Sequence, residues 1–395
     1  MITRRVLDDI TPSVTLTLNS KVKDMRKEGK NVISFTVGEP DFHTPEYIKQ
    51  EGIKAIQNNF TKYTPGAGIK ELREAIAKKL KQENNIDYSM ENIVVSSGGK
   101  QAISSAIYAL TDPGDEVIIP SPFWLSYPVI AKITGAKPKI VKTLPQNDYR
   151  ITPEELKKEI TEKTKILMLN SPSNPTGIVY RKEHLEALVP VIKESNITVI
   201  SDEIYEQLIY DELTFTSLAQ YEEIKDQVII INGVSKSFAM TGWRIGYAAV
   251  PDKNVAKAMV KVQSHLTGSS CAISQKASCA AIEEKLKDQN KLKDMIETFQ
   301  NRRDLAYDLI TRIPNLKCSR PQGAFYLFPQ VDYFYKNGIE NSTQLANHLL
   351  QNFNVAVVPG GDFGNDENIR ISFATSDENI KEGIARIEKA LLSIG

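Results

Sequence analysis

The stretch Lys165-Ile166-Leu167-Met168-Leu169-Asn170 places four apolar residues in a row between a lysine and an asparagine. A second stretch, Val228-Ile229-Ile230-Ile231, has the same character. A strand with one solvated face alternates apolar and polar residues, whereas a strand covered on both faces is apolar throughout. The two stretches therefore predict central strands of a mostly parallel sheet with helices on both faces.

Strands and helices are expected to alternate around these stretches. The strands of this sheet are expected at Ile93–Ser97, Glu116–Pro120, Lys165–Asn170, Ile197–Asp202, Val228–Asn232 and Ile245–Val250. The helices between them are expected at Lys70–Gln82, Lys100–Leu110, Lys182–Ser195 and Lys253–His265. Such alternation is typical of a doubly wound α/β domain.

The C-terminal part of the chain does not alternate in this way. Helical stretches cover roughly Lys285–Ile313, strand-like pieces follow, and a final helix begins at Asp377. The strand-like pieces are Ala324–Phe328, Val355–Val358 and Asn368–Phe373. We therefore expect a smaller α+β domain of 1–47 and 291–395 beside a large α/β domain of 48–290.

The composition limits the classes of function. Lys+Arg and Asp+Glu both total 49 among 395 residues, so the net charge is zero. A chain without a basic field is not typical of a protein that binds nucleic acid or a membrane surface. Three cysteines without a CxxC pair indicate free thiols, so we expect neither disulfides nor a metal site. Residues 1–9 lack a signal-peptide core, and the cytoplasm is the expected compartment.

A glycine-rich segment follows one expected strand and opens a helix. It reads Ser96-Ser97-Gly98-Gly99-Lys100-Gln101-Ala102, and its glycines let backbone N–H groups approach an anion. The alternative interpretation is a tight turn without a ligand. The segment is neither a Walker loop nor a GxGxxG motif, which disfavours ATP and NAD.

Other polar segments follow the remaining strands. Asn170–Gly177 is irregular because of its prolines and glycine, and Asp202 ends a strand. Lys236 follows the strand Val228–Asn232 and Arg244 comes shortly after it, and a nearby cation can depress the pKa of a lysine and make it a nucleophile. Singly, these features also fit a surface turn, a helix cap and a solvated lysine. Their common position at one sheet edge favours a single ligand site.

In this order and spacing, the motifs resemble those of a known family. The chain is similar to class I aminotransferases of fold type I, and to the bacterial aspartate aminotransferase subgroup among them. The segments that carry the resemblance are Val37–Phe42, Lys62–Pro65, Asn170–Gly177, Ser201–Tyr205, Ser235–Arg244, Pro321–Tyr326 and Ile369–Ser372. The resemblance implies an enzyme that uses pyridoxal 5′-phosphate (PLP), with a large, mostly parallel seven-stranded sheet domain and a smaller α+β domain.

The resemblance also implies roles for residues around the cofactor. Lys236 matches the Schiff-base lysine, which then acts as general base and acid. Asp202 matches the carboxylate that pairs with the pyridine nitrogen, and Tyr205 and Asn174 match the donors to the phenolic oxygen. Trp124 matches the aromatic residue that stacks on the ring.

Further matches concern the phosphate and the substrate. The residues that match the phosphate cup are Gly98, Gly99, Lys100, Ser235 and Arg244. Tyr63 matches a tyrosine that reaches the phosphate from the partner subunit, which implies a homodimer. Arg370 matches the arginine that binds the α-carboxylate of the substrate. Gly38 matches a residue whose backbone contacts the same carboxylate. Asn174 and Trp124 complete the implied substrate site.

The reaction implied is ping-pong transamination between an L-amino acid, L-aspartate first, and 2-oxoglutarate. Aromatic or N-acyl-diaminopimelate-type donors are alternatives, as is a C–S lyase or decarboxylase on the same fold. A cofactor-sensing transcription regulator is disfavoured because the family motifs begin by Gly38.

Three positions depart from the family pattern or leave a role open. Gly233 stands where many relatives have a hydroxyl that binds phosphate, so cofactor affinity is the property affected. Thr11 stands where relatives that use prephenate often have a lysine, which argues against prephenate as a substrate. Lys100 is a candidate cation for the distal carboxylate of aspartate, with a backbone-only contact as the alternative.

Overall fold

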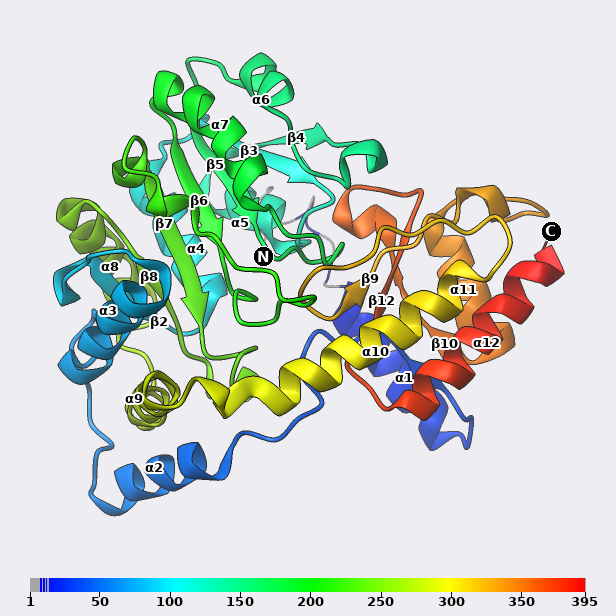
Figure 1. Ribbon diagram of the computed structural model, residues 1–395, viewed down its shortest axis with the longest axis horizontal. Coiled ribbons are helices and arrows are strands. Elements are labelled where there is room, and N and C mark those ends of the chain that lie inside the picture. Colours follow the sequence, from blue (N-terminus) through cyan, green and yellow to red (C-terminus); the bar gives the residue numbers. More distant parts are fainter. Residues whose placement is uncertain (1–7, 9, 11, 13, 395) are drawn as a thin grey trace.

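The largest sheet of the protein has seven strands and carries the expected mostly parallel arrangement (Figure 1). The computed structural model describes residues 8, 10, 12 and 14–394. The strands are β2 (Ile93–Ser96), β3 (Glu116–Ser121), β4 (Lys137–Lys142), β5 (Thr164–Asn170), β6 (Thr198–Asp202), β7 (Val228–Gly233) and β8 (Gly246–Ala249). Their order is β2-β8-β7-β6-β5-β3-β4, and β8 alone runs antiparallel to both of its neighbours.

Both faces of this sheet are buried, as the apolar strands predict. In β5, Ile166 and Met168 belong to one hydrophobic cluster, and Leu167 and Leu169 belong to another. The covering helices are α3 (Lys70–Asn84), α4 (Gly99–Leu110), α5 (Ser126–Thr134), α6 (Pro153–Glu159), α7 (Lys182–Ser195), α8 (Lys253–Leu266) and α9 (Ala272–Lys287). The doubly wound α/β architecture is therefore confirmed.

A second, smaller group of elements combines the C-terminal part with the N-terminal segment. Its strands are β1 (Ile33–Ser34), β9 (Tyr326–Leu327), β10 (Val355–Ala356), β11 (Val358–Pro359) and β12 (Ile369–Ser372). β11, β12 and β9 form an antiparallel sheet, and β1 pairs in parallel with β10. The pairing of β1 with β10 brings the N-terminal segment into the same group of elements as the C-terminal part. The domain boundaries at 47/48 and 290/291 stay a prediction.

Helices pack around these small sheets. They are α1 (Val14–Lys27), α10 (Lys293–Thr311), α11 (Ser342–Phe353) and α12 (Asp377–Ile394), while α2 (Glu46–Gln57) packs against α9. The long helix α10 runs from the large sheet region toward α12 and lies against it (Figure 1). None of the helices in the described residues is both long and apolar enough to cross a membrane.

The structure interrupts one expected helix and adds elements that were not expected, among them the helices α1, α2, α5, α6 and α11. The expected helical stretch Lys285–Ile313 is interrupted, because α9 ends at Lys287 and a short 3-10 turn, Gln289–Leu292, precedes α10. The side chain of Asp288 caps this turn by accepting a hydrogen bond from the backbone N–H of Asn290 at 3.0 Å. Strand β4 was not expected, since it lies at the sheet edge and buries only Val141.

Candidate active site

The carboxyl ends of the central strands meet at one edge of the large sheet. Asn170 at the end of β5 pairs with Asp202 at the end of β6, and Gly233 at the end of β7 pairs with Gly246. A cavity of about 500 Å³ opens at this edge. The predicted site residues that line it are Gly38, Gly99, Lys100, Trp124, Asn174, Asp202, Tyr205, Ser235, Lys236, Arg244 and Arg370. The structure therefore brings the side chains expected at the strand ends together around one cavity.

Lys236 extends into this cavity from the loop after β7. Its Nζ donates a hydrogen bond to the backbone carbonyl of Gly38. Burial lowers the pKa of Lys236 to about 8, with Arg370 and Arg244 lowering it further and Glu39 opposing them. A partly desolvated amine with a pKa near neutrality is a competent nucleophile, so Lys236 is not a solvated surface lysine.

Asp202 supplies a buried carboxylate to the same cavity. It is 5% exposed, and its Oδ2 accepts a hydrogen bond from the hydroxyl of Tyr127 at 2.6 Å. Its Oδ1 accepts from the backbone N–H of Ile204 at 3.2 Å. Burial raises the pKa of Asp202 to about 6, against the lowering effect of these hydrogen bonds. At neutral pH the cavity therefore holds an anion suited to a cationic ligand group.

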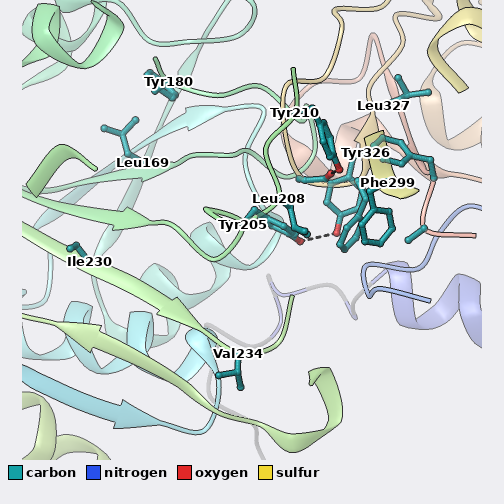
Figure 2. Packing of buried hydrophobic residues seen from close by; sticks show 14 of the residues in the cluster. Leu169, Tyr180, Tyr205, Leu208, Tyr210, Ile230, Val234, Phe299, Tyr326 and Leu327 are labelled. Atoms are coloured by element: carbon teal, nitrogen blue, oxygen red, sulfur yellow. Dashed lines mark hydrogen bonds between the residues drawn. The ribbon is translucent and has the colours of Figure 1, made fainter. Parts of the chain in front are cut away.

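Two tyrosine hydroxyls meet beside the cavity. Tyr205 and Tyr326 share a hydrogen bond of 2.9 Å, and Figure 2 shows their side chains pointing toward each other. Burial raises the pKa of both hydroxyls, so both remain protonated at neutral pH. Two protonated phenols in contact can donate to an anionic oxygen placed beside Tyr205.

Arg370 on β12 is a buried cation with unused donor capacity. Its side chain lies between the rings of Tyr326 and Phe363, with the guanidinium carbon 4.6 Å and 5.0 Å from their centroids. Nη1 donates to Asn174 Oδ1 at 3.0 Å, and Nη2 donates to the carbonyl of Thr36 at 2.8 Å. Its Nε has no hydrogen-bond partner among the described residues. A buried arginine that lines a cavity is expected to bind a ligand carboxylate.

The N-terminus of α4 beside the cavity is suited to a phosphate. Gly98 caps α4 with φ of 87°, and a Cβ at this position would lie 2.3 Å from Arg244 Nη2. The glycine therefore lets the guanidinium of Arg244 approach the helix N-terminus, where free N–H groups and the helix dipole attract anions. Both hydrogen bonds of Arg244 go to backbone carbonyls, those of Thr241 and Ser97.

Lys100 and Trp124 lie together next to this anion site. The Nζ of Lys100 is 5.0 Å from the centroid of the Trp124 ring. Burial and the charge of Arg244 lower the pKa of Lys100. Lys100 lines the cavity with its side chain largely exposed, so its role toward a distal carboxylate stays a prediction.

Some predicted residues stand apart from the cavity. The side chain of Tyr63 is 99% exposed. Gly233 is buried in β7, where a Cβ would lie 2.8 Å from both the Cα of Gly246 and the carbonyl oxygen of Ile245. The close approach of β8 leaves no room for a side chain at this position, which explains the departure at Gly233. Thr11 lies outside the described residues.

Several cavity residues were not singled out from the sequence. Tyr326 ends the family segment Pro321–Tyr326, so its position there was the available signal, whereas Tyr127 lies outside the named segments, three residues after Trp124. Thr15, Leu16 and Asn19 line the cavity from α1, which no motif marks. Their contribution depends on the packing of α1 onto the rest of the chain, which local sequence does not reveal.

Fold and cavity together define an α/β protein with a cavity that contains a buried lysine. The family model "Aminotransferase class I and II" matches residues 30–387. The chain belongs to this family and is an aminotransferase.

Similar proteins cover nearly the whole chain. Aspartate aminotransferase from Bacillus subtilis is 43% identical over 382 residues, which are 96% of each chain. A probable aspartate/prephenate aminotransferase from Rickettsia felis is 44% identical over 98% of this chain and 96% of its own. The structure of Thermus thermophilus aspartate aminotransferase with maleate matches with a TM-score of 0.93 and 39% identity, covering 99% of this chain and all of that one.

Proposed function

We propose that the protein catalyses PLP-dependent transamination between L-aspartate and 2-oxoglutarate by a ping-pong mechanism. The observation that carries the proposal is the buried cation Arg370, which lines the cavity together with Lys236. Amino acids and 2-oxo acids both carry the α-carboxylate that such an arginine would bind. The printed names of the relatives from Bacillus and Thermus favour aspartate among the donors.

The donor set of the cavity fits PLP in each of its polar groups. The glycine-rich turn with Arg244 and Ser235 would hold the phosphate, and Asp202 would face the ring nitrogen. Tyr205 and Asn174 would donate to the phenolic oxygen, and the ring of Trp124 would stack on the cofactor. The amine of Lys236 would bind the cofactor covalently.

When bound, PLP supplies an electron sink for the pair released from the substrate Cα–H bond. Asp202 supports this chemistry by remaining ionised and keeping the ring nitrogen protonated. Once the substrate amine had taken its place on the cofactor, the freed amine of Lys236, whose pKa burial lowers to about 8, would accept the proton from Cα and return it to the cofactor side as general base and acid. Arg370 and Gly38 hold the substrate carboxylate so that the Cα–H bond faces Lys236.

The second carboxylate of aspartate needs a second cation. Lys100 is our candidate, because it lies over Trp124 at the cavity wall and its amine is partly desolvated. An ammonium group in such a place binds a carboxylate more strongly than one in bulk solvent. This arrangement favours dicarboxylic donors over aromatic ones.

We further propose a homodimer in the cytoplasm. The exposed ring of Tyr63 supports a partner contact, because a fully solvated tyrosine gains nothing from its own subunit. The three cysteines, Cys271, Cys279 and Cys318, are free thiols, which agrees with a reducing compartment.

A donor panel with 2-oxoglutarate tests the proposal. Glutamate formation should be fastest with L-aspartate. If aromatic donors exceed L-aspartate by more than about tenfold in kcat/KM, which is about 1.4 kcal/mol of transition-state binding, aspartate is the wrong donor. Ammonia and pyruvate in place of glutamate would identify a C–S lyase instead.

A further inference from the structure

Tyr127 connects the two residues proposed to hold the cofactor ring. It lies in the first turn of α5 and is 2% exposed. Its hydroxyl donates to Asp202 Oδ2 at 2.6 Å, and its ring meets that of Trp124 edge-on, with centroids 5.3 Å apart and planes at 84°. Its backbone N–H also bonds the carbonyl of Trp124 at 2.9 Å, which fixes the two side chains relative to each other.

We propose that Tyr127 is a positioning residue that keeps Asp202 ionised and fixes the orientation of its carboxylate toward the ring nitrogen of PLP. The inference rests on the proposed function, since it gives Asp202 a cationic ring nitrogen to pair with. It adds a residue of α5 whose hydroxyl contacts Asp202.

The protein surroundings of Asp202 explain why such a residue is needed. Burial favours the neutral acid, and a neutral carboxyl group cannot pair with a protonated ring nitrogen. Two neutral donors face its oxygens, the Tyr127 hydroxyl and the Ile204 N–H, while Lys236 is the cation that acts on it and Tyr205 lies nearby. The hydrogen bonds from Tyr127 and Ile204 do not depend on the charge of Lys236.

Tyr127 is suited to this task because it stays a donor. Burial and the neighbouring Asp202 raise its pKa well above the usual value, so it keeps its proton at any working pH. The direction of the hydrogen bond is therefore fixed from Tyr127 to Asp202. A hydrogen bond to a charged acceptor stabilises the charged form and shifts the acid dissociation constant accordingly.

The Tyr127→Phe variant removes the hydroxyl and keeps the ring packed against Trp124. In the full-length enzyme freed of PLP, the titration of Asp202 can be followed by its carboxyl infrared band, identified by subtracting the spectrum of Asp202→Asn. We expect Y127F to lower the acid dissociation constant of Asp202 about tenfold and to weaken PLP binding about tenfold. In holoenzyme made with ¹⁵N-labelled PLP, the ring nitrogen signal should move toward its unprotonated position.

Tyr180→Phe is the matched control. Tyr180 is also a buried tyrosine, but its hydroxyl accepts from the backbone N–H of Ile151 away from the cavity. It should change neither the Asp202 titration nor the nitrogen signal. Should Y127F fail to fold, 3-fluorotyrosine at position 127 makes a stronger donor and should raise the dissociation constant of Asp202.

Two results would distinguish a failure of the role of Tyr127 from a failure of the proposed PLP-dependent function. An Asp202 titration that is unchanged in Y127F, or unchanged by the fluorotyrosine, overturns the role of Tyr127. If instead the titration shifts but D202N binds PLP as tightly as wild type, the link between Tyr127 and Asp202 stands and the proposed cofactor role of Asp202 fails.

Discussion

Arg370 donates a hydrogen bond to Asn174, with Nη1 and Oδ1 3.0 Å apart. Arg370 belongs to β12 of the small antiparallel sheet, whereas Asn174 lies in the loop after β5 of the large sheet. The contact therefore joins the residue proposed to hold the substrate carboxylate to one proposed to hold the cofactor. The two binding functions share one buried polar connection across the two parts of the fold.

Arg370→Lys should separate charge from geometry. Lysine keeps a positive charge but cannot form the paired hydrogen bonds of a guanidinium with a carboxylate. We expect kcat/KM for L-aspartate to fall about 100-fold, which is about 2.7 kcal/mol. Steady-state kinetics measures this, with Arg386→Lys on α12, which bonds Glu382 and the carbonyl of Asn31, as the matched control. A loss below threefold would remove Arg370 from the substrate site.

Lys100→Met should change donor preference rather than activity as a whole. The variant keeps an apolar stem over Trp124 and removes the ammonium group proposed to meet the distal carboxylate. We expect kcat/KM for L-aspartate to fall about tenfold. The value for L-phenylalanine should change little, because this donor has no second carboxylate. The aromatic donor serves as the internal control. An equal loss for both donors would assign Lys100 to the cofactor alone.

Glu203 should make the stability of the protein depend on pH. It is 1% exposed, its Oε1 accepts from Ser201 and Ser217, and its Oε2 has no partner among the described residues. Burial and the charge of Glu206 raise its pKa from 4.5 to about 8. The folded state therefore holds this proton more tightly than the unfolded state, and the free energy of unfolding falls as pH rises from about 4.5 to about 8.

Glu203→Gln replaces the carboxyl group with an amide that does not titrate, so position 203 no longer contributes to the pH dependence of the free energy of unfolding. We expect the variant to lose less stability than wild type between pH 5 and pH 8.5, by at least about 1 kcal/mol. Urea unfolding at the two pH values measures the difference. Parallel pH profiles for the two proteins would mean that Glu203 ionises normally in the folded state.

Gly233 should tolerate no side chain. A Cβ there would lie 2.8 Å from the Cα of Gly246, so β7 and β8 would have to separate. We expect Gly233→Ala to lower the free energy of unfolding by roughly 1–3 kcal/mol. At Gly242 a Cβ meets nothing within 4 Å, and Gly242→Ala should stay within about 0.5 kcal/mol of wild type. Urea unfolding of both variants gives the comparison, and equal stability of the two would refute the crowding at β8.

The sequence predicted the central sheet well for a physical reason. Strands such as β5 and β7 are buried on both faces, and such strands consist of uninterrupted apolar residues that can be recognised in the sequence. Strand β4 has no such signature, because it lies at the edge and buries only Val141. The small strands β1, β9, β10 and β11 are two residues long, and their pairing depends on contacts distant in sequence.

The site was predictable where function depends on motifs at strand ends. Lys236, Asp202 and Arg244 follow or precede strands of one sheet, and parallel strands bring such residues to one edge. Tyr127 could not be identified in the same way, because its role depends on a hydrogen bond to Asp202 that only the packing of α5 creates. The need for glycine at position 233 could also not be predicted from the sequence, because it follows from the close approach of Gly246 in the fold.

The most direct test of the central claim is reduction of the enzyme with sodium borohydride in the presence of PLP, followed by peptide mapping. Reduction fixes the cofactor to the amine that holds it. Lys236 is the amine within the cavity whose pKa is lowered to about 8, and we predict that the label appears on this residue alone. A label on Lys100, the other cavity lysine, or on any residue besides Lys236, would contradict the account.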